Sequence, residues 1–187
     1  MKVKLHHNII IEEVNLDNID LLRKLRNNDS LKSILSVNKK ITKEEQIRWF
    51  ESIDKCLNFY FLIYINNQLK GYCLLKNIDF AKKIGEPGIF LIDKNLWNST
   101  LGSILTIAYL DFCTDSYNLE YFFGNVLHSN TKAKSNYQLF ETNIYKDSEK
   151  ETFLMSSMKY CKMNKINKIR KILEDLENYQ RDFQIID

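Results

Sequence analysis

The alternation of apolar and polar residues divides the chain into short strands and amphipathic helices. Two-residue periodicity and apolar runs predict strands over residues 4–14, 58–65, 69–78, 86–92, 118–126, 143–146 and 152–160. Three- and four-residue spacing predicts helices over residues 18–27, 31–35, 42–54, 100–116 and 132–140. Most strands follow one another as antiparallel neighbours, with one strand–helix–strand crossover between residues 86 and 126. This order predicts an α+β fold with a mixed, mostly antiparallel central sheet flanked by helices.

Local signals support several of these boundaries. Thr42 and Glu45 have the spacing of a capping box, which marks the start of a helix. The polar tripeptide 66–68 lies between two β-rich runs and predicts a hairpin. Asp17 is expected to cap the first helix, and the apolar run at 118–126 indicates a strand buried on both faces.

The segment after residue 162 has a pattern of its own. Its apolar residues recur at three- and four-residue spacing, which predicts an amphipathic helix containing Ile166, Ile169, Leu173, Leu176 and Phe183. Two interpretations stay open: this helix lies against its own domain, or it is a dimerisation element of a homodimer. We therefore expect a domain at residues 1–162 and a C-terminal helical extension at 163–187.

Composition narrows the classes of protein to consider. The chain has 187 residues, of which 44% are hydrophobic and 27% charged, as in ordinary globular domains. The net charge of +3, from 27 basic and 24 acidic residues, is too balanced to indicate a nucleic-acid-binding face. The sequence has no apolar run long enough to span a bilayer, and its first residues lack the apolar core of a signal peptide. These features favour a cytoplasmic protein that binds neither nucleic acid nor membranes.

The cysteines agree with a reducing compartment. Cys56, Cys73, Cys113 and Cys161 are widely spaced, and three of them lie in apolar segments, so we expect reduced thiols. The sequence contains no Cys-x-x-Cys pair, and its cysteines and histidines have no metal-ligand spacing. We therefore expect no metal site.

A strand, a polar loop and a helix across residues 85–105 form the candidate active centre. Pro87 has no N–H to donate and Gly88 tolerates unusual dihedral angles, so strand pairing should break or bulge there. A hydroxyl residue, Ser99 or Thr100, is suited to cap the following helix. The first turn of that helix offers N–H groups and a positive dipole end to phosphate oxygens. The stretch thus combines an anion site with the carboxylate that precedes Pro87.

Three motifs of the chain occur together in one enzyme family. A Glu, a Gly and a Phe in segment 86–90 fall as in the fourth strand of many members, and segment 97–103 lies where the pyrophosphate loop of that family lies. Segment 130–137 contains an Asn, an Ala three residues on, and a Tyr four residues after that. Over residues 3–160 the chain thereby resembles the GNAT superfamily of acyl-CoA-dependent N-acyltransferases. It differs in the loop, where Gly102 stands alone and the family usually has two or three glycines.

The N-terminal half resembles one branch of that superfamily, the acetyltransferases of nucleotide-linked aminodideoxy sugars, such as those of the pseudaminic acid pathway. The similar segments are 25–28, 41–42, 46–51 and 60–62. The resemblance implies direct transfer, in a ternary complex, of an acetyl or short acyl group from acetyl-CoA or 3-hydroxybutyryl-CoA. The acceptor it implies is the amino group of a UDP- or dTDP-linked sugar used for bacterial surface glycans such as the lipopolysaccharide O-antigen. The nucleotide base, the ring carbon that carries the amine and the acyl length stay open.

The resemblance and the chemistry of acyl transfer also suggest roles for individual residues. Tyr137 is the candidate general acid and Glu86 the candidate base; the alternatives are a packed tyrosine and an exposed acid at a strand start. The candidate acyl-CoA contacts are Phe90, Leu91, Trp97, Asn98, Ser99, Thr100, Leu101, Gly102, Ser103, Asn130 and Ala133. The candidate acceptor contacts are Arg26, Asn27, Gln46, Trp49 and Asn125. For Arg26, Trp49 and Asn130 the alternatives are a helix-end cation, a core aromatic and a helix cap.

Two other functions stay open at this point. A protein N-terminal or ribosomal-protein acetyltransferase of the same superfamily would need an open acidic groove for a peptide. A catalytically silent acyl-CoA-binding domain, which dimerises or docks through residues 163–187, would agree with the phosphate loop that has a single glycine.

Overall fold

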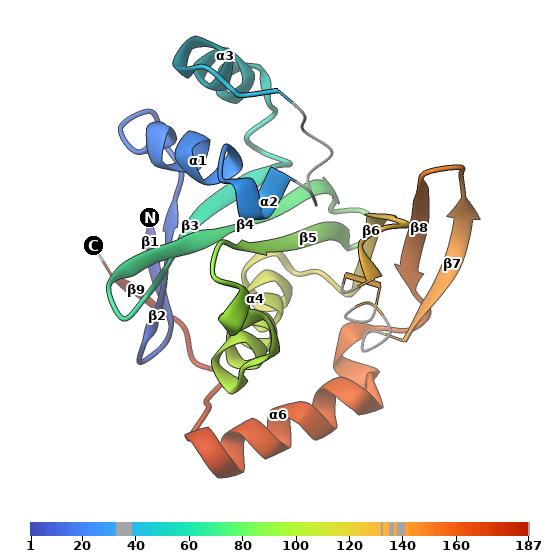
Figure 1. The fold of residues 1–187 in the computed structure, drawn as a ribbon. Helices are drawn as coiled ribbons and strands as arrows, with labels where there is room; N and C mark the ends of the chain where they lie inside the picture. Colours follow the sequence, from blue (N-terminus) through green and yellow to red (C-terminus); the bar gives the residue numbers. More distant parts are fainter. Residues whose placement is uncertain (33–38, 132, 135–136, 138–140, 187) are drawn as a thin grey trace.

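The computed structural model describes residues 1–187 except 33–38, 132, 135–136, 138–140 and 187. The described residues form one 9-stranded sheet with the strand order β7-β8-β6-β5-β4-β3-β2-β1-β9 (Figure 1). The strands are β1 (Lys2–His6), β2 (Ile9–Glu13), β3 (Phe59–Ile65), β4 (Gln68–Asp79), β5 (Ile84–Leu91), β6 (Tyr121–Leu127), β7 (Thr142–Asp147), β8 (Glu151–Ser156) and β9 (Gln184–Ile186). The α-helices are α1 (Ile19–Arg26), α2 (Asp29–Lys32), α3 (Lys43–Ser52), α4 (Thr100–Tyr117) and α6 (Asn164–Glu177), with 3-10 turns η1 (Lys94–Asn98) and η2 (Tyr160–Lys162).

The sheet separates two layers of helices. In Figure 1, α1, α2 and α3 lie over one face, and α4 lies under the other with α6 beyond it. A larger core fills the space between the sheet, α4 and the C-terminal segment, and a smaller core joins the opposite sheet face to α1 and α3. Neighbouring strands pair antiparallel, except that β5 and β6 pair parallel across the crossover through α4. The predicted α+β fold with a mixed, mostly antiparallel sheet is confirmed.

Local signals account for several elements. Thr42 caps α3, and its capping box with Glu45 is formed in both directions. Asn66 and Asn67 turn the β3–β4 hairpin with φ angles of 51° and 60°, the left-handed region that a tight two-residue turn requires. Asn18, rather than Asp17, precedes α1 at the N-cap position, and the Asn15 side chain accepts the N–H groups of the entering turn.

Two strand predictions were wrong. Residues 4–14 form a hairpin instead of one strand: β1 and β2 pair antiparallel, so that Val3 and Ile11 both reach the larger core. Strand β6 is not buried on both faces, because buried and less buried residues alternate along it and Asn125 is exposed. The predicted helices at 31–35 and 132–140 both include residues outside those described, so their full extent is not compared with the structure.

The C-terminal segment belongs to this same core. Helix α6 ends at Glu177, where Asn178 adopts the left-handed conformation, and β9 then pairs with β1. The prediction of a helix extending through the tail was therefore wrong after residue 177. Ile166 and Leu173 are buried, whereas Leu176, predicted to lie on the apolar face, is 72% exposed. Helix α6 lies against its own domain, which agrees with the first of the two interpretations above.

A buried carboxylate holds the tail to α4. Asp111 is fully buried and accepts hydrogen bonds from the hydroxyls of Tyr160 (2.9 Å) and Tyr179 (2.7 Å) and from Nε of Arg170 (3.1 Å). Burial, followed by the negative charge of Asp111, raises the pKa of both tyrosines, so they remain hydrogen-bond donors. We refer to these four residues as the Asp111 cluster.

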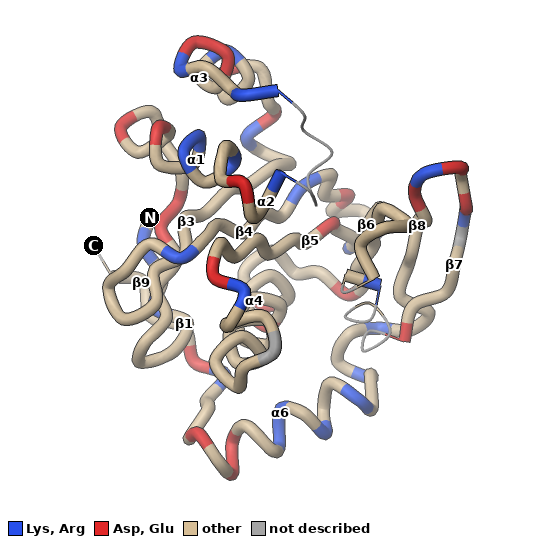
Figure 2. The backbone as a smooth tube through the Cα atoms, viewed as in Figure 1, with Lys and Arg blue, Asp and Glu red and all other residues tan. Residues whose placement is uncertain are grey.

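The described residues show neither a single-sign charged region of the backbone (Figure 2) nor a disulfide. Basic and acidic residues are interspersed over the described backbone, in agreement with the net charge of +3 (Figure 2). The four cysteines are free thiols, and burial raises the pKa of Cys73 and Cys113. In the described part of the chain, every helix is too short or too polar to cross a bilayer.

Candidate active site

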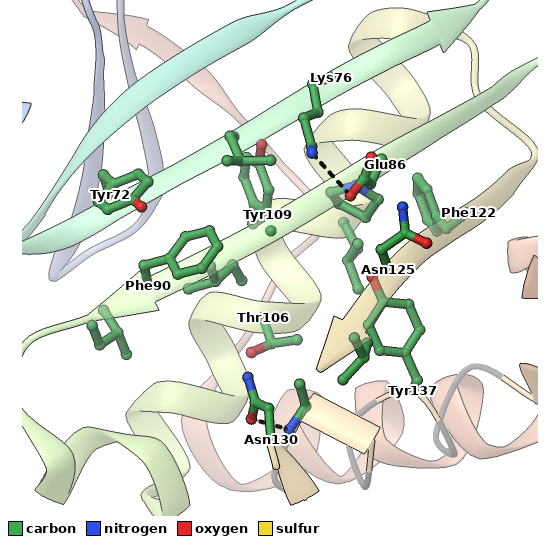
Figure 3. A pocket seen from close by; sticks show the side chains of 18 of the residues that line it. Tyr72, Lys76, Glu86, Phe90, Thr106, Tyr109, Phe122, Asn125, Asn130 and Tyr137 are labelled. Carbon is green, nitrogen blue, oxygen red and sulfur yellow. Dashed lines mark hydrogen bonds and ion pairs between the residues drawn. The ribbon is translucent and has the colours of Figure 1, made fainter. Parts of the chain in front are cut away.

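A cavity of about 560 Å³ opens where strands β5 and β6 separate (Figure 3). Both strands are fully described, and their parallel pairing consists of Ile84 with Tyr121 and Gly85 with Phe122. Beyond these pairs the two strands diverge, and residues of both line the cavity. Its volume is in the range of pockets that bind small molecules and cofactors.

The predicted break in pairing occurs on one edge of β5 only. Against β4, β5 stays in register from Gly71–Leu91 to Lys76–Glu86, so Pro87 and Gly88 do not interrupt that ladder. The irregularity with β4 lies instead between Lys76 and Asp79. Against β6, pairing ends before Pro87, as expected where a residue has no N–H to donate.

Glu86 is buried at one wall of the cavity. Its carboxylate is paired with the Lys76 ammonium (Oε1–Nζ 3.1 Å) and accepts a hydrogen bond from the Asn77 side-chain amide (Oε2–Nδ2 2.8 Å). The residue is 7% exposed and lines the cavity, so it is not an exposed acid at a strand start. A buried carboxylate that faces a cavity can accept a proton from a bound amine.

Tyr137 comes from the segment after β6, and its hydroxyl lies against that strand. The hydroxyl donates to the carbonyl of Phe123 at 3.4 Å, and a Cβ atom at Gly124 would lie 1.8 Å from it. Gly124 therefore provides the space that the hydroxyl occupies. Burial, and next the negative charge of Glu86, raise the pKa of Tyr137. A phenol that stays protonated can donate a proton or hydrogen bond to a leaving thiolate. In Figure 3 the Tyr137 ring lies beside β6, with its hydroxyl end toward Asn125.

The start of α4 forms one end of the cavity. Ser99 caps the helix: its Oγ accepts from the N–H of Gly102 (3.0 Å) and donates to the carbonyl of Leu96 (2.9 Å). A Cβ atom at residue 102 would lie 2.0 Å from that carbonyl, so only glycine fits there. Trp97 is fixed by a hydrogen bond from its indole N–H to the carbonyl of Leu91 (3.0 Å).

The other predicted acyl-CoA contacts are distributed unevenly around the cavity. Its described lining includes Phe90, Leu91, Trp97, Gly102, Asn130 and Ala133, and does not include Ser99, Thr100, Leu101 or Ser103. The side chain of Asn98 is outside what the structure describes. Asn130 both lines the cavity and caps the following turn, because its Oδ1 accepts from the N–H of Ala133 (3.0 Å).

The far end of the cavity is aromatic and basic. The Arg26 guanidinium lies over the ring of Trp49, 4.5 Å from its centroid, and donates to Oε1 of Gln46 (3.0 Å). Arg26 and Trp49 line the cavity together with Asn125. Gln46 and Asn27 are not among the described lining residues. Gln46 supports Arg26, and the Asn27 side chain binds the N–H and carbonyl of Ile41.

Several lining residues were missed in the sequence: Tyr60, Tyr72, Lys76, Thr106, Tyr109, Phe122 and Glu151. Tyr72 stacks on Phe90 with 4.8 Å between ring centroids, and Tyr60 meets Trp49 edge-on. Burial raises the pKa of Tyr60 and Tyr72, and the nearby Arg26 charge opposes this. The two-residue period of β4 puts Tyr72, Leu74 and Lys76 on one face, and this signal could have found them. Groups of three or more metal-ligating side chains are absent from the described residues.

The chain is similar in fold to several proteins of known structure. No protein-family model matches the chain, and no curated protein sequence matches it. The chain is similar to the N-acetyltransferase PseH of Campylobacter jejuni in complex with acetyl coenzyme A, at 24% identity, covering 79% of this chain and 96% of that one, with a TM-score of 0.58. It is also similar to spermidine N-acetyltransferase from Vibrio cholerae in complex with CoA and spermine (16% identity, 83% and 99% covered, TM-score 0.67).

A third similar structure is FdhC, described as a nucleotide-linked sugar GNAT (14% identity, 92% and 94% covered, TM-score 0.67). Each of the three structures is less than 25% identical to this chain, so the likeness is one of fold. The protein therefore has the fold of the GNAT N-acetyltransferases.

Proposed function

We propose that the protein is an acyl-CoA-dependent N-acyltransferase that acts on the amino group of a nucleotide-linked aminodideoxy sugar. One observation carries the proposal: β5 and β6 separate after two residue pairs, and the cavity between them has Glu86 on one side and Tyr137 on another. The neighbours give further support, since acetyl coenzyme A is bound to PseH and CoA to the spermidine enzyme, and FdhC is described as a nucleotide-sugar GNAT.

The acyl donor would lie along the divergent strands. Phe90 and Leu91 would face the pantetheine arm, with Asn130 and Ala133 on its other side. The N-terminus of α4 near Gly102 would hold the pyrophosphate through its N–H groups and dipole. Because backbone groups provide these contacts, the loop needs glycine only where the chain approaches itself, at Gly102.

The reaction would proceed by direct attack. Glu86 would accept a proton from the substrate ammonium, directly or through a water molecule, and leave a neutral amine. As the nitrogen–carbonyl bond forms, the carbon–sulfur bond breaks, and Tyr137 gives its proton to the departing thiolate. The proton lost by the attacking nitrogen then restores the phenol. The raised pKa of Tyr137, caused first by burial and then by Glu86, keeps the phenol protonated at neutral pH.

The acceptor end favours a substrate that carries both anionic and apolar groups. Arg26 can pair with phosphate oxygens, while Trp49, Tyr60 and Tyr72 offer aromatic faces for a base or sugar. The charged residues in the described lining are two cations, Arg26 and Lys76, and two acids, Glu86 and Glu151. A polyamine or a peptide amine would be better served by an excess of acid, which this lining lacks.

A thiol-release assay tests the class and the acceptor together. Acetyl-CoA and 3-hydroxybutyryl-CoA would be offered with UDP- and dTDP-linked 3- and 4-amino-6-deoxy sugars, and we expect release with one or two of them. Silence with acyl-CoA binding intact by calorimetry would favour a peptide substrate or a silent binding domain. Absence of acyl-CoA binding would overturn the proposal.

Tyr137→Phe separates an enzyme from a silent binder. We expect turnover to fall about 100-fold, since a general acid contributes at least this much, while acyl-CoA affinity is retained. Tyr64→Phe makes the same change at a half-buried tyrosine outside the described lining and should leave turnover unchanged. Equal turnover of wild type and Tyr137→Phe would remove Tyr137 from the mechanism.

A further inference from the structure

Strand β4 contains an irregularity directly beside Glu86. Lys76 is matched with Glu86, and the next matched pair is Asp79 with Ile84, so Asn77 and Ile78 together lie opposite Gly85. One extra residue on one strand is a β-bulge, a device that redirects side chains near active sites. Asn77 has a φ of 53°, in the left-handed region that asparagine tolerates better than most residues.

The bulge brings two consecutive side chains to one carboxylate. Along a regular strand, residues 76 and 77 would point to opposite faces of the sheet. Here Lys76 Nζ lies 3.1 Å from Oε1 of Glu86, and Asn77 Nδ2 donates to Oε2 at 2.8 Å. The N–H of Asn77 donates in turn to Oδ1 of Asn58 (3.1 Å), which ties the bulge to the start of β3.

Each oxygen of Glu86 is therefore held by a donor of its own. A carboxylate has about four lone-pair directions, so two donors fix its orientation and leave others for a ligand in the cavity. Tyr60 and Tyr137 line the same cavity, and burial, followed by the charge of Glu86, raises the pKa of both. Besides Glu86 and Lys76, the charged residues in the described lining are Arg26 and Glu151. Lys76 is the cation that contacts it.

We propose that Lys76 and Asn77 are positioning residues that orient Glu86 toward the substrate amine. The inference rests on the proposed function. Asn77 sets the carboxylate plane. The Lys76 ammonium holds Oε1 and the Asn77 amide holds Oε2, so the carboxylate presents its remaining lone pairs to the amine.

Two substitutions, each with a matched control, test the inference in the full chain. Asn77→Gly removes the amide but keeps a residue that adopts positive φ, and its control is Asn67→Gly at the hairpin turn, where φ is 60°. Lys76→Met keeps the aliphatic stem and removes the charge. Its control is Lys82→Met, which removes an exposed lysine that is paired with Asp79 in the turn between β4 and β5.

We expect Asn77→Gly and Lys76→Met each to lower kcat about tenfold, a fraction of the ~100-fold or more that a general base contributes. The KM for acyl-CoA should stay unchanged, and Lys76→Arg should recover turnover relative to Lys76→Met, because it keeps the cation. The two controls should equal wild type. A purely structural role would instead lower the melting temperature with kcat of the folded fraction preserved.

The outcomes separate this inference from the proposed function. Wild type that releases thiol with an aminosugar, together with unchanged kcat in Asn77→Gly and Lys76→Met, would overturn the positioning roles alone. Wild type that is silent with every amine in the panel would overturn the proposed function and this inference with it.

Discussion

Glu86 and Asp111 are two buried carboxylates with opposite surroundings. Asp111 is fully buried and is held by two tyrosine hydroxyls and a guanidinium, which come from η2, from α6 and from the residues after α6. Glu86 is 7% exposed and is held by one ammonium and one amide from the adjacent strand. Asp111 is not among the residues lining the cavity, whereas Glu86 is.

The difference shows how the same group serves structure or chemistry. The donors around Asp111 satisfy it within the core, so its contribution is to attach the tail to the helix that begins at the cavity. Glu86 keeps accepting capacity toward an open space, and the Tyr137 phenol, whose pKa its charge helps to raise after burial, donates to the carbonyl of Phe123 at 3.4 Å. Burial alone does not identify a functional acid. A functional acid is identified by a cavity on the side where its carboxylate can still accept a hydrogen bond.

The largest effect is expected at Asp111. Asp111→Asn leaves Arg170 without its buried counter-charge, and breaking such a pair costs about 3–5 kcal/mol of unfolding free energy. Urea unfolding followed by circular dichroism would measure it. The double variant Asp111→Leu with Arg170→Met should lose less than the two single changes added together, because no charge stays unpaired. Unchanged stability of Asp111→Asn would show that the cluster does not hold the tail.

Glu86→Gln should affect turnover in place of stability. The amide keeps the shape and removes the proton acceptor, so we expect kcat to fall about 100-fold, equivalent to about 3 kcal/mol in the activation barrier. Steady-state kinetics and thermal melting measured on the same preparation give both quantities. A large drop in melting temperature with little change in kcat would place Glu86 in the same class as Asp111.

Gly124→Ala tests how the Tyr137 phenol is held in place. The new methyl would meet the Tyr137 hydroxyl, so we expect the hydroxyl to move and kcat to fall about tenfold, with acyl-CoA binding retained. In the Tyr137→Phe background the same change should add little, and the two losses should not be additive. Full additivity would mean that Gly124 acts on something other than this tyrosine.

The smallest effect is expected at Asp79, a half-buried carboxylate at the end of β4. Asp79 pairs with Lys82 near the end of β4, and water screens this pair. Asp79→Asn should leave both kcat and the melting temperature within experimental error of wild type. A measurable loss of turnover would instead extend the acidic wall of the site beyond Glu86.

Much of the fold could be predicted because the signals are local. The Thr42–Glu45 capping box, the Asn66–Asn67 turn and the apolar period of 100–116 each depend on residues within a few positions of one another. The N-terminal hairpin was missed because residues 4–14 are apolar enough to be read as one continuous strand. The tail was misread after residue 177, where Asn178 ends the helix and pairing with β1 makes a strand.

The site was predicted in part for the same reason. Glu86, Tyr137, Gly102 and Asn130 belong to short motifs, and each of them lines the cavity. Lys76 and Tyr72 lie on β4 outside any motif, and Tyr60 belongs to a similar segment, 60–62, to which no site role was assigned. Only pairing across the sheet brings the three to the same wall. The roles assigned to all these residues remain predictions for the experiments above.

The sequence by itself determined which segments become helices and strands, their order, and the motif residues at the centre of the crossover, because hydrophobic period, caps and turns act over short distances. Only the tertiary structure decided which edge of β5 opens. It also decided that the β4 bulge turns Asn77 toward Glu86 and that Asp111 is closed off by the tail. These features join residues far apart in the chain, and their partners are fixed by packing of the sheet against α4.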